Sequence, residues 1–363
     1  MKIKLRNISL GLVVLAWAAL AVFAWFKPAR DMSVAERRPL TQFPIVDGES
    51  ILDRSFMEDF EDYSLDQFPL RDSFRQLKAQ FHYNLLLQKD NNDIYIADGY
   101  AAQLEYPLND EAVGHALERL QWVTDKYLAD CKVYCAVIPD KGYYLAAENG
   151  YPAMDYAVLF NKVKESLPGA THITLTDCLG ISDYYRTDTH WRQEKLISAA
   201  TRLCEAMGVS APTGLTPTKQ DVSFYGVYYG QAALPMEPEA LYTMNSELLA
   251  DCKVYDYETG KTVSVYDTEK LSGKDPYEVY LSGPKSLLKI ENPNASTDRE
   301  LVVFRDSFGS SMVPLLVQDY KSVTLVDIRY INSWQLERYV EFTDQDVLFL
   351  YSTLVLNNGT TLK

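Results

Sequence analysis

The sequence has 363 residues, of which 47% are hydrophobic and 23% are charged. This balance excludes a disordered chain and is enough to bury a sizeable core. The formal net charge of -15 disfavours a nucleic-acid partner, because binding a polyanion requires clustered cations. Five scattered cysteines do not make a disulfide framework, although one disulfide stays open for an exported chain. We expect no metal centre and no cofactor.

The first feature along the chain is an uncharged, almost entirely apolar run at residues 8–26. A helix of that length nearly spans a hydrocarbon core of about 30 Å. Three basic residues precede the run, so we expect residues 1–7 in the cytoplasm and residues 27–363 outside the cell membrane. A cleaved signal peptide is the alternative, since Val22 and Ala24 suit the positions before a cut. The run is, however, longer than the apolar part of most signal peptides.

The next part of the chain changes from polar to aromatic. Residues 27–50 are polar and contain three prolines, which predicts a stalk. Residues 51–90 carry aromatic side chains at helical spacing, interrupted by one proline, and so predict two helices. A short hairpin at 93–106 and a helix at 110–129 follow. We expect 51–130 to be a helical region that packs on the body.

From residue 131 onward, strand and helix patterns alternate. Such alternation predicts an α/β body with a parallel sheet. Residues 215–285 differ, because their Tyr/Gly-rich runs FYGVYYG, KVYDY, TVSVY and YEVYLSG suggest short strands inserted over one edge of the sheet. Tyrosine-rich surfaces often contact sugars or proteins, but half-buried strand residues are the plainer reading. The predicted strands are 132–139, 171–176, 301–305, 322–327 and 347–351, and the predicted helices are 154–166, 191–207 and 307–318.

His190 is set apart from the other three histidines by a carboxylate two positions earlier. In an extended turn, residues i and i+2 point the same way, so Asp188 can reach the imidazole. A carboxylate there accepts the Nδ1 proton and leaves Nε2 free as a base. The other histidines fall in helical patterns or at a strand start.

Ser307 follows the hydrophobic strand Leu301–Arg305 and begins a helical pattern. The carboxyl ends of parallel strands are where such sheets present ligand groups. The Ser307 amide at this junction can stabilise a developing oxyanion. The alternative is that Asp306 or Ser307 only caps the helix. A serine hydroxyl becomes a useful nucleophile when a base takes its proton, and His190 is the one histidine with the setting of a base.

These stretches resemble the DHHW proteins, relatives of the SGNH-hydrolase-like alginate O-acetyltransferases. YYRTDTHW looks like the family signature, with Thr189 where a histidine is common. KIENPNASTDRELVVFRDSFGSSMVPLL is similar to its serine block, and SVTLVDIRYI and DVLFLY to its closing strands. AERRPLTQFP and DQFPLRDSF resemble its N-terminal region. The resemblance implies an SGNH-like three-layer α/β/α sandwich.

The resemblance also implies a triad of Ser307, His190 and Asp188. Aspartate and histidine precede the serine, whereas ordinary SGNH hydrolases run in the opposite order, so a permuted arrangement is implied. Two departures concern the serine and its oxyanion donors. Arg305 stands where a glycine is common, and the segment around Gly283 lacks the asparagine that the family often shows. The amides of Ser307 and Gly283 would then serve as oxyanion donors.

Three further residues are candidates for substrate binding. Arg329 could hold a substrate oxygen or the acyl carbonyl, with a salt bridge to Asp327 as the alternative. Lys141 follows the first strand on the same expected edge of the sheet. Trp191 directly follows His190 in the signature. We assign all three provisionally to substrate contact.

The function implied is transfer of an acetyl group to a glycan through an acetyl-serine. Water in place of the sugar would make the protein a carbohydrate acetylesterase, and the residues do not choose between the two. The family context implies a membrane-bound O-acyltransferase partner that relays the acetyl group. The alternative class is a non-catalytic glycan-binding or scaffold protein of an acetylation system.

Overall fold

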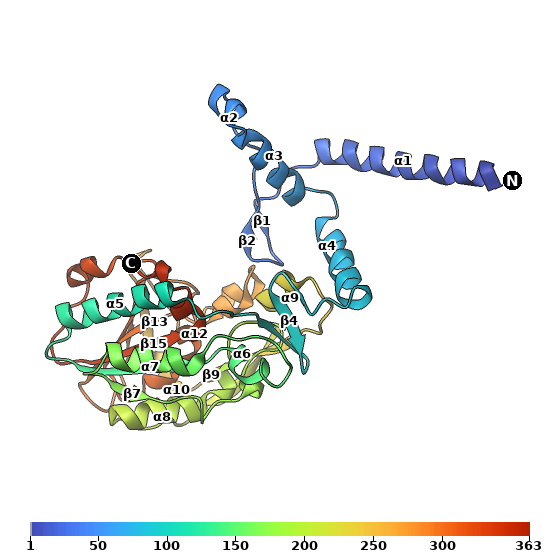
Figure 1. The fold of residues 1–363 in the computed structure, drawn as a ribbon. Coiled ribbons are helices and arrows are strands. Elements are labelled where there is room, and N and C mark those ends of the chain that lie inside the picture. The colour runs from blue at the N-terminus through green and yellow to red at the C-terminus, as the bar shows by residue number, and fades with distance from the viewer. Residues whose placement is uncertain (1) are drawn as a thin grey trace. The chain divides into compact units, whose positions relative to one another are not determined.

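The computed structural model describes residues 2–363 and divides into two compact units (Figure 1). The first unit comprises the chain up to Asn92 together with Tyr229–Pro235. The second comprises Asp93–Tyr228 and Met236–Lys363. The boundary at Asn92 therefore falls inside the segment 51–130 that we expected to be one region.

The first unit begins with one long helix, α1 (Lys2–Phe26). Its residues Asn7–Phe26 have a mean hydropathy of 2.3 and are long and apolar enough to cross a membrane. None of this segment is buried against the rest of the described chain. An N-terminal helix of this kind also fits a signal sequence.

Residues 27–50, expected to be a stalk, contain a small hairpin fastened by ionic contacts. Both Arg38 and Arg71 contact the carboxylate of Asp66, at 2.6 and 3.1 Å. The Arg38 guanidinium holds the pKa of Asp66 well below its usual range. The elements of this part are β1 (Met32–Ser33), β2 (Arg38–Pro39), α2 (Gly48–Leu52), α3 (Ser55–Asp66), α4 (Arg71–Gln80), the π turn Phe81–Leu85 and β3 (Asp90–Asn91).

The second unit is built on an eight-stranded sheet whose order is β11-β10-β12-β14-β13-β15-β6-β7. From β14 through β7 every neighbouring pair is parallel. These strands are β6 (Lys132–Ile138), β7 (Thr171–Ile173), β13 (Glu300–Arg305), β14 (Ser322–Val326) and β15 (Asp346–Ser352). The expected α/β body with a largely parallel sheet is confirmed.

One edge of this sheet is antiparallel, which corrects the expectation of a purely parallel sheet. The three strands are β10 (Lys253–Asp256), β11 (Lys261–Val263) and β12 (Leu287–Glu291). A tight turn with Gly260 at φ +66° joins the first two. A parallel pair would need a crossover of a dozen or more residues, so this short connection dictates a hairpin.

Alternate residues of each central strand face two separate cores. Leu301 and Val303 join the core with α8 (Ile197–Met207). Val302 and Phe304 join the opposite core with helices that include α5 (Asp110–Tyr127) and α7 (Tyr156–Ser166) (Figure 1). Helices on both faces make this unit a three-layer α/β/α arrangement. That second core also includes Leu356 of α12 (Thr353–Asn357) and Leu336 of the 3₁₀ turn Ser333–Arg338, and the 3₁₀ turn Gly359–Thr361 packs against α5.

The segment 215–285 is only partly the set of strands we expected. FYGVYYG turns into a helix, α9 (Val227–Ala232), and YEVYLSG into the 3₁₀ turn Pro276–Val279. Asp275 caps that turn by accepting from the Tyr277 amide, and Pro276 suits its first position, so a helical start outweighs the tyrosine-rich strand pattern. The segment also contains β8 (Thr216–Phe224), paired with β9 (Glu239–Asn245), and α10 (Glu247–Asp251).

Three shorter features lie near the site. The expected hairpin is present as β4 (Ile94–Ala97) and β5 (Tyr100–Gln103), whose turn has positive φ angles at Asp98 and Gly99. The helix after β13 is shorter than expected. It consists of α11 (Gly309–Met312) and a 3₁₀ turn, because Pro314 lacks the N–H needed to continue an α-helix. A further short helix, α6 (Lys141–Leu145), follows β6.

Candidate active site

Ser307, His190 and Asp188 form one continuous chain of hydrogen-bonding groups. Nε2 of His190 lies 2.8 Å from Oγ of Ser307, and Nδ1 lies 2.6 Å from Oδ1 of Asp188. An ionised carboxylate only accepts, so Nδ1 carries the proton and Nε2 presents its lone pair to the hydroxyl. This is the geometry in which an imidazole takes a proton from a serine. We call these three residues the triad.

The Asp188 carboxylate is fully buried and accepts several hydrogen bonds. Oδ1 also accepts from the His190 backbone N–H at 3.0 Å, and Oδ2 accepts from the Val227 N–H at 2.8 Å. Bonds to backbone N–H groups favour the charged form of a buried carboxylate. The contact with its own residue i+2 is the one that the D-x-H spacing predicts.

Two aromatic rings also pack against the imidazole of His190. The ring of Tyr277 stacks on His190 with centroids 3.9 Å apart and planes 10° from parallel. Phe308 packs against the same imidazole at 5.0 Å. The hydroxyl of Tyr277 bonds Oγ of Ser311 at 2.8 Å, which fixes the stacking ring in turn. The imidazole therefore has little freedom to rotate away from Ser307.

Ser307 lies in the turn between β13 and α11, at the carboxyl end of the central strand. Asp306 shapes this turn, because its carboxylate accepts from the Phe308 N–H at 3.0 Å and from the Ser352 N–H at 2.7 Å. The second bond ties the end of β13 to the end of β15. Ser307 is half-buried, and within residues 2–363 no backbone hydrogen bond employs its N–H. That N–H stays a predicted donor to a developing oxyanion.

The other predicted oxyanion donor is already occupied. Gly283 has φ +84°, and its N–H donates to the Tyr280 carbonyl at 3.2 Å. A Cβ at this position would come within 2.8 Å of the Glu278 side chain, so the turn needs glycine for backbone reasons. The structure therefore corrects the assignment of the Gly283 amide to the oxyanion.

Trp191 cannot contact a substrate as this structure stands, because the side chain is fully buried. Its indole N–H lies 3.1 Å from the Phe308 carbonyl and 2.9 Å from Oγ of Ser311. The indole therefore ties the histidine segment to the turn and helix that carry Ser307. We correct its assignment from substrate contact to internal support.

Lys141 is also buried rather than open to substrate. Its Nζ donates to the carbonyls of Tyr185 and Arg186 at 3.0 and 3.3 Å and lies 4.9 Å from the Tyr228 ring centroid. Burial lowers the pKa of Lys141 to about 7, against the raising effect of Asp188 and other acids. The amine supports the loop before Asp188, which corrects the expected substrate contact.

Arg329 makes the salt bridge that was its alternative assignment. The guanidinium contacts both oxygens of Asp327, at 2.9 and 2.6 Å, and this carboxylate raises the pKa of Arg329. Asp327 is fully buried and also lies 3.6 Å from the guanidinium of Arg305. A role for Arg329 in holding a substrate oxygen stays a prediction.

Sequence reasoning missed the two residues that organise the site from a distance along the chain. Glu239 lies about 50 positions after the D-x-H motif and accepts from the Thr187 N–H at 2.8 Å. Tyr277 lies in a run that we interpreted as a strand. Neither has a local signal, because each acts through a contact that only the fold creates.

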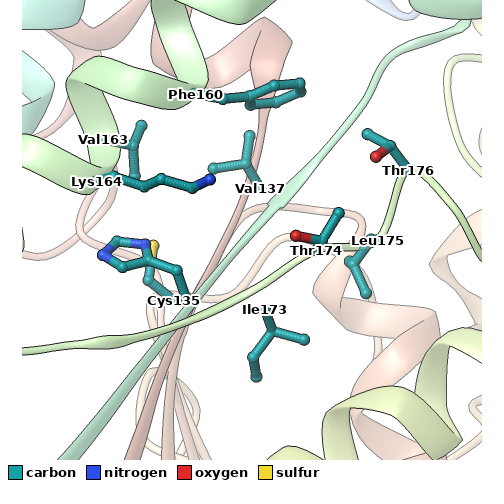
Figure 2. A pocket seen from close by; sticks show the side chains of 10 residues that line it. Cys135, Val137, Phe160, Val163, Lys164, Ile173, Thr174, Leu175 and Thr176 are labelled. Atoms are coloured by element: carbon teal, nitrogen blue, oxygen red, sulfur yellow. The ribbon is translucent and has the colours of Figure 1, made fainter.

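A separate pocket lies between α7 and the strands β6 and β7 (Figure 2). None of the triad residues lines it, so it is not the site described above. Its lining residues are Cys135, Val137, Phe160, Val163, Lys164, His172, Ile173, Thr174, Leu175 and Thr176.

Fold and site together define an α/β protein with a Ser–His–Asp arrangement at the carboxyl ends of parallel strands. A family model described as DHHW protein matches residues 180–326, a segment that contains the whole triad. The expected relation to the DHHW family is thus confirmed over that segment. No curated protein matches the sequence at a significant level.

Several solved structures are similar to this chain at low sequence identity, and the first two below share its fold. A DHHW family protein from Eubacterium siraeum has 21% identity and a TM-score of 0.59, covering 75% of this chain and 94% of its own. Bacillus cereus PatB1 with a sulfonyl adduct has 19% identity and a TM-score of 0.55, covering 72% and 95%. The O-acetyltransferase domain of Pseudomonas putida AlgJ has 13% identity and a TM-score of 0.46, covering 73% and 92%.

The close approach of Gly226 to the triad gives a first prediction. An added Cβ would lie 2.3 Å from backbone and side-chain atoms of Asp188 and from the Thr187 carbonyl. Gly226→Ala should therefore displace Asp188 and lower serine-dependent ester hydrolysis at least about tenfold. Gly114→Ala, in the middle of α5 with open space around it, is the control and should be neutral or stabilising. Equal activity of Gly226→Ala and Gly114→Ala would contradict the close approach of Gly226 to Asp188.

The burial of Trp191 gives a second prediction. Trp191→Phe removes the indole N–H and leaves a cavity, so the free energy of unfolding should fall by about 3 kcal/mol. Denaturant unfolding of the purified protein measures this. A substrate-contact role predicts the opposite pattern, a raised KM with unchanged stability.

Proposed function

We propose that the protein is a membrane-anchored, extracytoplasmic O-acetyltransferase that acetylates a cell-surface or exopolysaccharide glycan through an acetyl-serine. The observation that carries this proposal is the 2.8 Å contact between Nε2 of His190 and Oγ of Ser307, backed by the buried Asp188. The match to the DHHW family supports acyl transfer, because the stretches that resemble this family are also similar to the alginate O-acetyltransferases. The arrangement is SGNH-like, with aspartate and histidine placed before the serine in the chain.

The first half-reaction moves the acetyl group to the protein. Oγ of Ser307 attacks the acetyl carbonyl while its proton passes to Nε2 of His190. The Ser307 N–H faces the developing oxyanion. The C–O or C–S bond to the donor then breaks, the leaving group takes the proton from Nε2, and the acetyl ester remains on Ser307.

The second half-reaction runs the same proton path in reverse. A glycan hydroxyl gives its proton to Nε2 of His190 and attacks the acetyl-serine. The ester bond to Ser307 breaks, and Oγ regains the proton from Nε2. Asp188 stays ionised and keeps the imidazole in the Nδ1–H tautomer throughout. Water as acceptor gives acetate instead of an acetylated glycan.

Membrane anchoring through α1 would keep the second unit near its acetyl source. An extracytoplasmic site has no access to cytoplasmic acetyl donors, so the acetyl group must be relayed across the membrane. A membrane-bound O-acyltransferase is the class of partner that supplies this step. The basic residues before α1 support a cytoplasmic N-terminus, with residues 27–363 on the far side.

Substitution of the triad tests the proposal directly. Ser307→Ala and His190→Ala should each abolish hydrolysis of an activated acetyl ester by the full-length protein. Asp188→Asn should lower kcat by about 10³–10⁴-fold, because the amide favours the wrong imidazole tautomer. His82→Ala, at a half-buried histidine in the first unit, is the matched control and should keep full activity. Normal turnover by Ser307→Ala would refute the acetyl-serine route.

A second experiment separates transfer from hydrolysis. Mass spectrometry should detect an acetyl adduct on Ser307 after exposure to the ester, and added glycan oligosaccharides should remove it faster than water does. Phenylmethylsulfonyl fluoride should modify the same serine, since an adduct of this class is recorded for PatB1. Release at the same rate with and without any sugar would assign the protein to the esterases.

Topology is tested by protease access. Trypsin added to intact cells should digest residues 27–363 and leave an N-terminal tag protected and attached to α1. Loss of the tag from the full-length chain would indicate a cleaved signal peptide. Protection of both parts would contradict an extracytoplasmic active site.

A further inference from the structure

The loop that precedes Asp188 is held in an unusual way. Residues 184–191 form a hairpin, closed by a bridge between Tyr184 and Trp191 and by the Tyr185 N–H donating to the His190 carbonyl at 3.0 Å. Asp188 lies at its tip, and His190 lies on the returning arm. The peptide groups just before the tip bond side chains from two other elements. The placement of the acid–base pair depends on how these peptides are held.

Lys141, at the start of α6, bonds two successive carbonyls of the loop. Nζ reaches the Tyr185 carbonyl at 3.0 Å and the Arg186 carbonyl at 3.3 Å. In an extended strand, successive carbonyls point to opposite sides, so they cannot share one partner. The shared amine therefore marks a bend in the chain, two residues before Asp188. The Arg186 carbonyl accepts in addition from the Ala101 N–H of β5 at 2.8 Å.

Glu239, in β9, bonds the opposite ends of the same two peptide groups. Its carboxylate accepts from the Arg186 N–H at 2.9 Å and from the Thr187 N–H at 2.8 Å. The peptide between residues 185 and 186, and the one between 186 and 187, each meet Lys141 at the carbonyl and Glu239 at the amide. The N–H end of each peptide dipole therefore faces a buried carboxylate, and the carbonyl end faces a buried amine.

The contacts continue from Glu239 to the second oxygen of Asp188. The Thr187 hydroxyl donates to Glu239 at 2.9 Å and accepts from the Gly226 N–H at 3.0 Å. The next amide, that of Val227, donates to Oδ2 of Asp188 at 2.8 Å. Glu239 is therefore linked to the Asp188 carboxylate in two ways. One runs through the loop residues Arg186 and Thr187, and the other through the amides of Gly226 and Val227.

We propose that Lys141 and Glu239 are a pair of positioning residues that hold Asp188 against His190. We call the pair the loop clamp, and its catalytic consequence rests on the proposed function of the triad. The clamp fixes two peptide planes, and these set the direction from which the Asp188 carboxylate approaches Nδ1. Burial of both side chains, at 2% and 9% exposure, keeps water from replacing either partner.

The loop clamp predicts a loss of kcat with little effect on KM. Lys141→Met keeps the apolar stem and removes the amine. Glu239→Gln keeps the shape but turns an N–H₂ group toward an N–H donor of the loop. Each change should lower kcat for ester hydrolysis by about 10²-fold while KM changes less than about twofold, since a displacement of about 1 Å in a reacting group has that effect. The full-length protein in detergent is used throughout.

The matched control is Arg299→Met. Arg299 also donates to two successive carbonyls, those of Met207 and Gly208, and it also contacts a carboxylate, that of Asp346. It lies next to the amino end of β13, whereas Ser307 follows the carboxyl end. Arg299→Met should lower thermal stability, because it leaves two carbonyls and a carboxylate without their partner, and it should leave kcat per folded molecule unchanged.

A spectroscopic readout tests the clamp without relying on turnover. The short bond from Nδ1–H of His190 to Asp188 should give a far-downfield proton resonance, which His190→Ala assigns by its loss. Lys141→Met and Glu239→Gln should weaken or shift this resonance, and Arg299→Met should not. If either clamp variant fails to fold, Thr187→Val removes only the hydroxyl that bonds Glu239 and should also weaken or shift the resonance.

The outcomes separate the two proposals. Folded clamp variants with an unchanged resonance and unchanged kcat would overturn the clamp, whatever their melting temperatures. A wild-type protein with no serine-dependent turnover would refute the proposed function, and the resonance would still decide the clamp. A displaced resonance with lowered kcat and normal KM supports both.

Discussion

The structure of the site depends on one buried carboxylate that the protein itself has to solvate. Asp188 has no exposed surface, and an unpaired charge in such a place would be expensive. Two backbone N–H groups and one imidazole N–H replace water around its oxygens. These donors come from the hairpin 184–191 and from the start of α9. Both segments have to be in place before His190 can face Ser307.

Much of the fold could be predicted from the sequence because its signals are local. Hydrophobic runs bounded by turn residues identified the parallel strands, and the predicted end of the helix at residue 207 is confirmed, since Gly208 follows α8 at φ +67°. The antiparallel pairing of β12 with β10 and β14 could not be predicted in the same way, because it depends on which strands meet in the fold. At Tyr277 a local cap overrode the strand propensity of a tyrosine-rich run.

The site could be predicted only for residues whose function is visible in their spacing. Asp188 and His190 are two apart, and Ser307 follows a hydrophobic strand, so the motif and the junction were both readable. The burial of a side chain cannot be predicted from this spacing. For that reason the sequence predicts substrate contact for Lys141 and Trp191, although both are buried. A lysine and a tryptophan next to a site look the same in a sequence whether they face solvent or the core.

Arg305 shows how the chain accommodates a bulky residue next to the nucleophile. The side chain is fully buried, and its guanidinium extends toward Asp327 at 3.6 Å and the Lys285 carbonyl at 3.4 Å. Its Cβ and Cγ occupy the space where a Cβ on residue 309 would lie, at 2.7 and 3.0 Å. Glycine is therefore required at position 309, one turn after the strand. The glycine that the serine turn needs here lies two residues after Ser307, and the triad geometry is kept.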